Sequence, residues 1–101
     1  MKIIYDTVII GAGPAGIQAA IHAARKKTKV LLIGRTENSA LYNGHIENYA
    51  FVDGISNGYD MLAVGLTQAK RFGTEVLNED LLKITQENDL FHLELENGGS
   101  V

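Results

Sequence analysis

A short glycine-rich stretch holds the residues of this sequence whose types and spacing are best suited to chemistry. Gly11, Gly13 and Gly16 follow a Gly-x-Gly-x-x-Gly spacing. In such a turn the first glycine permits a sharp change of direction, the second lets bare backbone approach a pyrophosphate, and the third lets a helix lie close to a strand. Pro14 suits the first helical position, because its missing N–H costs nothing there. The stretch is therefore predicted to bind a phosphate group at the N-terminus of a helix.

The elements on both sides of the glycines fit this chemistry. Four β-branched residues, 7–10, precede Gly11 and predict a strand that is apolar on both faces, as in the centre of a parallel sheet. The helix that follows Gly13 is predicted to face the sheet with its small and branched residues, namely Ile17, Ala20, Ile21 and Ala24. Residues 30–33 are a second apolar run. They predict the next strand and complete a strand-helix-strand unit.

The end of the second predicted strand departs from the simple fingerprint of a dinucleotide site. An acidic residue at this place would hold the ribose hydroxyl groups. The sequence has Gly34 and Arg35 instead, and the first carboxylate is that of Glu37. An arginine at this place can accept a ribose 2′-phosphate, so a bound NADP is one interpretation.

The following segment, 36–56, is predicted to be irregular, and a loop of this length favours ligand binding. A helix is then expected over about 58–72, with Asn57 as N-cap and Gly73 at its C-terminal end. Apolar residues recur in it at helical spacing and are expected in the core: Met61, Leu62, Leu66, Ala69 and Phe72.

Beyond Gly73 the pattern becomes that of strands. Residues 74–77 predict a third parallel strand and 81–85 a further one, followed by a turn at 87–89. Apolar Phe91, Leu93 and Leu95 then alternate with polar residues, which indicates a half-exposed antiparallel strand. The predicted fold is α/β, a Rossmann-like parallel sheet with a C-terminal antiparallel β-hairpin. Because the turn signal at 97–99 is followed by only two residues, the sheet is expected to be incomplete at the C-terminus.

Composition narrows the classes of function. The chain has 101 residues, the size of one small domain or of part of a larger one, and 46% of them are hydrophobic. Its net charge of -3 provides no basic surface for nucleic acid, and zero cysteines exclude a disulfide framework, a Cys-x-x-Cys redox pair and a thiolate metal site within it. No leader peptide or membrane-spanning run is recognisable, so we expect a soluble, cytoplasmic protein.

No catalytic group stands out. His22, His45 and His92 lie in three separate predicted elements, without a cysteine or carboxylate at ligand spacing. No nucleophile has a base beside it. We therefore predict neither a catalytic residue nor a metal site.

Taken in order, these motifs resemble the N-terminal part of the thioredoxin reductase-like flavoproteins, within the pyridine nucleotide-disulfide oxidoreductase group. The resemblance spans essentially the whole chain, 1–101, as the N-terminal segment of an FAD/NAD(P)-binding Rossmann-type domain. It rests on residues 5–16, Ala23-Ala24-Arg25, residues 30–33, Ile46-Glu47-Asn48-Tyr49, residues 54–58 and residues 68–76.

The resemblance implies that the bound dinucleotide is FAD and that NAD(P)H is the electron donor of the complete protein, a homodimer. It places the pyrophosphate on the glycine turn, the AMP half and the approach to the flavin along 33–41, the flavin ring near Asn48, and the adenine at the backbone of Leu81. The implied cofactor-binding residues are Gly11, Ala12, Gly13, Pro14, Ala15, Gly16, Ile33, Gly34, Arg35, Ser39, Ala40, Leu41, Asn48 and Leu81.

Two departures from the family pattern affect the flavin side of this site. The usual Gly-Gly-Gln-Leu is replaced by Asn38-Ser39-Ala40-Leu41, which removes a side-chain amide, and the usual Pro-Gly is replaced by Ala50-Phe51. The nicotinamide domain and its Cys-x-x-Cys pair would lie beyond Val101. We therefore expect a fragment of a longer enzyme that has no disulfide reductase activity by itself. The alternatives are a stand-alone NADP-binding or sensing module and, less favoured because no acidic residue ends the second strand, an S-adenosylmethionine enzyme.

Overall fold

A computed structural model describes residues 3–51, 54 and 56–100 of the chain. Residues 52, 53 and 55, which belong to the predicted loop and to the motif at 54–58, lie outside the described part. The elements, in order, are β1 (Thr7–Ile10), α1 (Pro14–Arg25), β2 (Val30–Ile33), the 3₁₀ helix η1 (Thr36–Asn38), β3 (His45–Ile46), β4 (Ser56–Asn57), α2 (Gly58–Arg71), β5 (Glu75–Leu77), β6 (Leu81–Glu87) and β7 (Leu90–Leu95).

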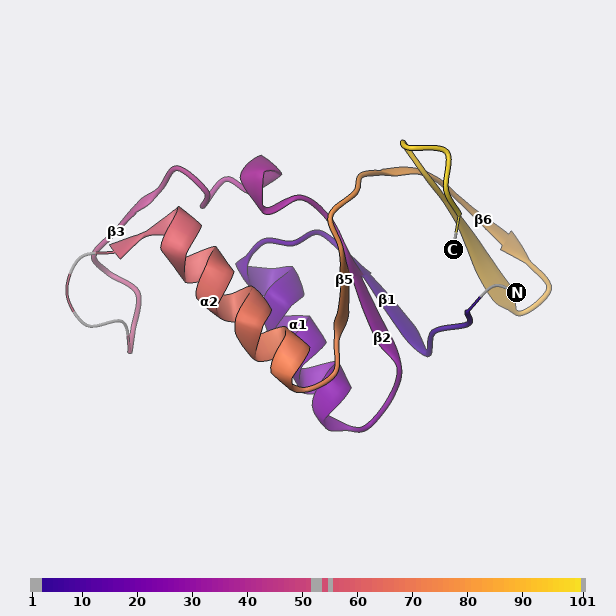
Figure 1. Cartoon of the computed structure of the whole chain (residues 1–101), viewed down its shortest axis with the longest axis horizontal. Helices are drawn as coiled ribbons and strands as arrows, with labels where there is room; N and C mark the ends of the chain where they lie inside the picture. Colours follow the sequence, from indigo (N-terminus) through magenta and orange to yellow (C-terminus); the bar gives the residue numbers. More distant parts are fainter. Residues whose placement is uncertain (1–2, 52–53, 55, 101) are drawn as a thin grey trace.

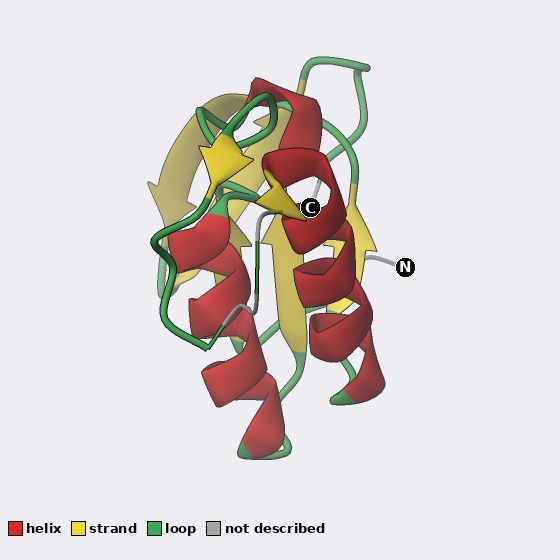
Figure 2. Cartoon of the chain, turned by 90° about the vertical axis from the view of Figure 1, so that its left-hand side faces the viewer, coloured by secondary structure: helices red, strands yellow, loops and turns green. Residues whose placement is uncertain are grey.

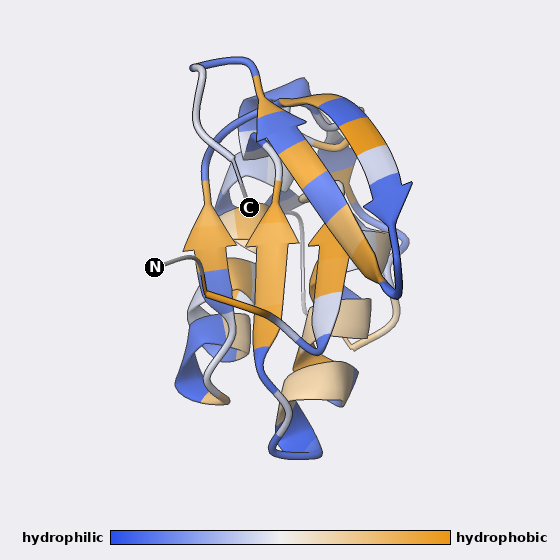
Figure 3. Ribbon diagram, turned by 90° about the vertical axis from the view of Figure 1, so that its right-hand side faces the viewer, coloured by the Kyte–Doolittle hydropathy of each residue, from blue (hydrophilic) through white to orange (hydrophobic). Residues whose placement is uncertain are grey.

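The described residues form three layers. Strands β1, β2 and β5 pair in parallel, in the order β1-β2-β5. Helices α1 and α2 pack side by side against one face of this sheet (Figures 1 and 2). The antiparallel hairpin of β6 and β7 covers part of the other face (Figure 3). No helix in these residues is long and apolar enough to cross a membrane.

Strand β2 is the centre of the core because both of its faces are covered. Val30 and Leu32 are fully buried against the helices, in one cluster with Ala20 of α1 and Leu62 of α2. The two alternate residues, Leu31 and Ile33, point the other way and pack against hairpin residues Leu93 and Leu95. An all-apolar strand is therefore explained by a sheet with two covered faces.

The predicted α/β fold, with its parallel sheet and C-terminal hairpin, is confirmed, whereas the first strand, predicted as central, lies at one edge of the sheet that the described residues form. Strand β2 is central, and β1 pairs only with β2 within the described residues. The crossovers through α1 and α2 run in the same direction, so both add a strand on the same side of β1. One consequence is that Ile10 is 50% exposed.

Phe72, which was predicted in the core, and Phe91, on the apolar side of the alternating strand, are both exposed. Phe72 is 43% exposed, because α2 ends at Arg71 and the Phe72 ring lies outside the core. The Cζ atom of Arg25 lies 5.8 Å from the centroid of this ring. Phe91 is 61% exposed, because it lies near the free end of the hairpin, whereas Leu93 and Leu95 reach the sheet. Spacing alone identified the face of each element and did not show where its packing partner ends.

The ends of α2 follow the prediction. The Asn57 side chain accepts a hydrogen bond from Asp60 N at 2.9 Å, which caps the helix, and Gly73 follows the last turn with φ +103°. The preceding segment, 36–56, was predicted as irregular, but it contains η1 and the short antiparallel pair β3–β4. The predicted turn at 97–99 is present, since Leu95 N donates to Gly99 O at 2.9 Å and Ser100 bridges Glu94.

Candidate functional site

The glycine turn connects β1 to α1 at the carboxyl end of the parallel sheet. Gly11 N donates a hydrogen bond to Ile33 O at 2.8 Å, which fixes the turn to the end of β2, and Gly11 has φ +114°. A Cβ on Gly16 would lie 1.8 Å from Gly11 O. The sequence therefore needs glycine at both positions, one for the left-handed backbone and one for the close approach of helix and turn.

The N-terminus of α1 presents backbone N–H groups that no carbonyl of the helix accepts. Gly13 is the N-cap and has no side chain, Pro14 is the first helical residue, and the first turn contains no acidic residue. The first intrahelical hydrogen bond is that of Ile17 N to Gly13 O, at 3.0 Å. The N–H groups of Ala15 and Gly16 therefore have no intrahelical acceptor, and the helix dipole adds positive potential there. This arrangement suits an anionic group.

Ser39 lies over the glycine turn. A Cβ on Gly13 would come within 3.2 Å of Ser39 Oγ, so a side chain at residue 13 would fill the space between them. Ser39 Oγ accepts a hydrogen bond from Leu41 N at 3.2 Å, which leaves its own hydroxyl hydrogen free to donate. Ala40 between them is exposed, while Leu41 is partly buried against the helical core.

The end of β2 forms one side of the turn. Ile33 is fully buried, and Gly34 N donates to Leu77 O of β5 at 3.1 Å. A Cβ on Gly34 would lie 2.7 Å from Ala12 N. Ile33 and Gly34, two of the predicted site residues, therefore contact the glycine turn.

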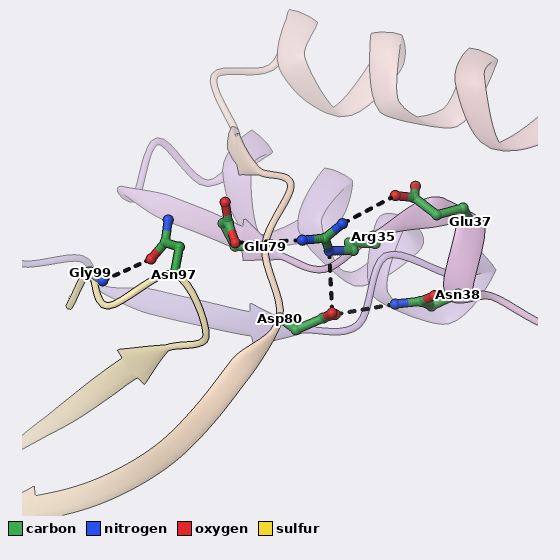
Figure 4. Close-up of polar contacts among 7 residues, drawn as sticks. All are labelled: Arg35, Glu37, Asn38, Glu79, Asp80, Asn97 and Gly99. Carbon is green, nitrogen blue, oxygen red and sulfur yellow. Dashed lines mark hydrogen bonds and ion pairs between the residues drawn. The ribbon is translucent and has the colours of Figure 1, made fainter.

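Arg35 lies in a ring of three carboxylates (Figure 4). Its Nε atom is 3.2 Å from Asp80 Oδ2, and its two terminal nitrogens are 3.8 Å from Glu79 Oε2 and from Glu37 Oε1. Asp80 Oδ1 also accepts a hydrogen bond from Asn38 Nδ2 at 3.3 Å. We call Glu37, Glu79 and Asp80 the carboxylate ring.

Glu79 and Asp80 were not among the predicted site residues. They follow β5, and β5 is the parallel neighbour of β2. The carboxyl ends of adjacent parallel strands meet at one edge of a sheet, so the acidic residues that follow the third predicted strand are the sequence signal for this cluster. Leu81 directly follows Asp80 and begins β6, so it too lies next to this cluster.

Asn48 is the residue predicted to lie near the flavin ring. It is exposed in the loop after β3, and within residues 3–51, 54 and 56–100 it forms no hydrogen bond with the glycine turn. Its neighbours Tyr49 and Phe51 line a groove together with Pro14 and Ile17. The role of Asn48 near a flavin stays a prediction.

Comparison with known proteins gives consistent matches over the same residues. A family model described as pyridine nucleotide-disulphide oxidoreductase matches residues 5–100. A thioredoxin reductase of Aquifex aeolicus is 42% identical over 88 residues, which are 85% of this chain and 27% of that protein. An NADH dehydrogenase of Bacillus subtilis is 35% identical over 95 residues, which are 93% of this chain and 18% of that protein.

The fold agrees with a solved structure of the same kind. The crystal structure of the atypical thioredoxin reductase from Desulfovibrio vulgaris Hildenborough matches with a TM-score of 0.85 at 31% identity, over 97% of this chain and 33% of that one. The resemblance to thioredoxin reductases inferred from the motifs is confirmed. The chain spans between 18% and 33% of the length of these three proteins.

Proposed function

Because the chain belongs to the pyridine nucleotide-disulphide oxidoreductase family, we propose that it is the FAD-binding portion of a thioredoxin reductase-like, NAD(P)H-dependent flavin oxidoreductase. The bound group is FAD, and its pyrophosphate lies on the glycine turn. The observation that carries this proposal is the uncapped N-terminus of α1, at which Gly13 leaves room for a ligand where a side chain would reach Ser39.

The residues present fit a dinucleotide. Ala15 and Gly16 supply backbone donors for the pyrophosphate, Gly13 allows it to approach, and no carboxylate in the first turn of α1 repels it. Ser39 adds a hydroxyl donor above the turn. The edge formed by Gly34 and Arg35 accommodates the adenosine half, as the crevice at the carboxyl ends of parallel strands does in such sheets.

The division of labour follows from what these residues can do. FAD, when bound, supplies the electron-transfer chemistry. The chain binds and orients it through backbone donors and shields one side of it with the helix-sheet core. Because the sequence contains no cysteine, this chain contributes no disulfide to the function. For the complete enzyme we propose a cytoplasmic homodimer, which sedimentation and cell fractionation of the intact protein would test.

The visible absorption spectrum of the chain, recorded after addition of excess FAD and desalting, tests the proposal. We expect retained bands near the flavin maximum of about 450 nm. The variant Gly13→Ala, whose new methyl group occupies the pyrophosphate approach, should lose at least about tenfold in FAD affinity, or about 1.4 kcal/mol.

Thr67→Ala on the exposed face of α2 is the matched control, because it also changes one small residue but lies away from the turn. It should retain FAD like the unmodified chain. A chain that folds but binds no FAD would refute the proposal, as would a Gly13→Ala variant that binds FAD with unchanged affinity.

A further inference from the structure

Six exposed basic residues gather at the end of the molecule opposite the glycine turn. They come from the end of α1 with the loop after it, and from the last turn of α2. Both helices run from the carboxyl end of the parallel sheet to its amino end, so their C-termini lie side by side (Figures 1 and 2). The contact between Arg25 and the Phe72 ring joins the two groups. We call this set the basic patch: Arg25, Lys26, Lys27, Lys29, Lys70 and Arg71.

The basic patch holds an excess of positive charge. The stretches that carry it, 7–36 and 61–74, contain no Asp or Glu. In the part of the chain that the structure describes, none of the six residues forms an ion pair. Asp6 and Glu75 lie at the same end of the sheet, but each carboxylate already accepts a hydrogen bond. Outside the patch the chain has three Lys or Arg residues against twelve Asp or Glu, so the net charge of -3 conceals a strong separation of charge.

One residue of the patch occupies a backbone conformation that favours another residue type. Lys27 follows the C-cap of α1 with φ +61°. The equivalent residue after α2 is Gly73, with φ +103°. Glycine is the usual residue at this position, because a Cβ is unfavourable in the left-handed region. Since Arg25 already complements the dipole of α1, the local structure of the helix does not account for a lysine at residue 27.

The surroundings of the patch indicate which kind of anionic partner it fits. Phe72 is 43% exposed beside Arg25, and an aromatic ring next to a guanidinium is typical of the centre of protein–protein interfaces. A nucleic acid duplex or a membrane surface is anionic over a large area, so it would also approach the carboxylates that dominate the rest of the chain. A short acidic segment of a protein can lie within the patch alone.

We propose that the basic patch is a docking surface for a protein partner and takes a short acidic segment with one apolar side chain, which packs on Phe72. Helix α1 has 12 residues, so the patch lies about 18 Å from the glycine turn. The surface is therefore separate from the proposed cofactor site, and binding to it does not require FAD. Because the attraction is electrostatic, it weakens as the ionic strength rises.

Two synthetic peptides of equal length are the probes for the full chain. One contains only glutamates, and the other contains glutamates with one central leucine. Each carries fluorescein, and binding is measured by fluorescence anisotropy at low ionic strength. We expect both to bind, the leucine peptide at least about threefold more tightly, and both affinities to fall as sodium chloride is raised. The affinities should be the same with and without excess FAD.

Charge-removing variants locate the binding surface. Lys26→Gln combined with Lys70→Gln removes one charge from each half of the patch and should weaken the binding of both peptides at least about fivefold. Lys83→Gln on β6 is the matched control, because it removes the same charge from an exposed residue elsewhere, and it should leave both affinities unchanged.

Two further variants test the roles of single residues. Phe72→Ala should remove the preference for the leucine peptide and leave the affinity for the all-glutamate peptide unchanged. Lys27→Gly should weaken the binding of both peptides about twofold. It should also keep or raise the urea midpoint, because glycine suits the left-handed backbone. A lysine that serves only the local structure would show a lower midpoint and an unchanged affinity.

The outcomes separate this inference from the proposed function. It is overturned if the folded chain binds neither peptide, or if binding ignores both salt and the double variant. A thymidine oligonucleotide and vesicles of phosphatidylglycerol with phosphatidylcholine are tested in the same buffer, and tighter binding of either than of the leucine peptide would overturn the assignment to a protein partner. Loss of FAD binding alone refutes the proposed function and leaves this inference standing.

Discussion

The backbone of Gly34, at the end of β2, packs directly against the backbone of Ala12 in the glycine turn. A Cβ at residue 34 would lie 2.7 Å from Ala12 N and 3.1 Å from Ala12 Cβ. The contact with Ala12 N is closer than a Cβ tolerates without movement of the backbone, and the contact with Ala12 Cβ is tighter than most side-chain contacts. The contact joins the sheet edge to the phosphate-binding turn, so the geometry of one depends on that of the other.

Gly34→Ala is therefore expected to destabilise the fold as well as the site. Overpacking of this kind costs typically about 1–3 kcal/mol. The free energy of unfolding from a urea titration should fall by that amount, and FAD affinity should fall with it. Gly13→Ala is the matched control, because its Cβ would meet only a serine side chain at 3.2 Å, so it should lose FAD affinity while it keeps most of its stability. Equal stability of both variants would contradict the role given to Gly34.

The cap of α2 makes a second, smaller contribution that can be measured. Asn57 accepts a hydrogen bond from Asp60 N at 2.9 Å and donates one from Nδ2 to Asp60 Oδ2 at 3.0 Å. Loss of an N-cap side chain costs about 0.5–2 kcal/mol. Asn57→Ala should therefore lower the urea midpoint, whereas Asn43→Ala, at an exposed turn, should leave it nearly unchanged. A cap variant as stable as the unmodified chain would show that tertiary contacts alone hold this helix end.

The order and type of the main elements could be predicted because local signals determine them. The glycine spacing, the β-branched run before it and the Asn57 cap each act within a few residues. The central place of β2 and the exposure of Phe72 and Phe91 could not be predicted. The strand order depends on the side of the sheet on which each new strand is added. The exposure of the two rings depends on where the neighbouring element ends. The residue spacing within one segment encodes neither of these.

The same division applies to the site. The turn was evident from Gly11, Gly13 and Gly16 because its chemistry is that of one contiguous stretch. The carboxylate ring was not, because Glu37 and Asp80 are 43 positions apart in sequence and meet only through the parallel pairing of β2 with β5. Arg35 considered alone suggested a ribose 2′-phosphate, whereas in the structure its guanidinium pairs with three carboxylates.

The stability of the chain should depend on alkaline pH through Tyr5. Its hydroxyl donates a hydrogen bond to Glu75 of β5, and this bond, together with burial and the Glu75 charge, raises the pKa of Tyr5 to about 12. The unfolded value is about 10. Because the folded pKa is the higher one, the contribution of Tyr5 to stability is fully present below about pH 10 and is lost as the pH rises through about 12.

Tyr5→Phe isolates this effect, since it keeps the ring and removes the hydroxyl. Unfolding midpoints of the variant and the unmodified chain should differ at pH 8 and converge as the pH approaches 12. In a phenolate absorbance titration of the folded chain, the variant should lack one late-titrating tyrosine. Curves that stay parallel through this range would show that the contact with Glu75 does not persist in solution.

The largest effect of a single substitution is expected at the centre of the sheet. Leu32 is fully buried, in one cluster with residues of helices α1 and α2. Leu32→Ala should therefore lower the free energy of unfolding by about 2–5 kcal/mol, from lost apolar burial plus the remaining cavity. Leu82→Ala is the matched control, because Leu82 on β6 is 65% exposed and should lose less than about 0.5 kcal/mol. Both are measured by urea unfolding. A Leu82 variant as unstable as the Leu32 variant would mean that the outer face of the hairpin is also covered in solution, and the three-layer core would need revision.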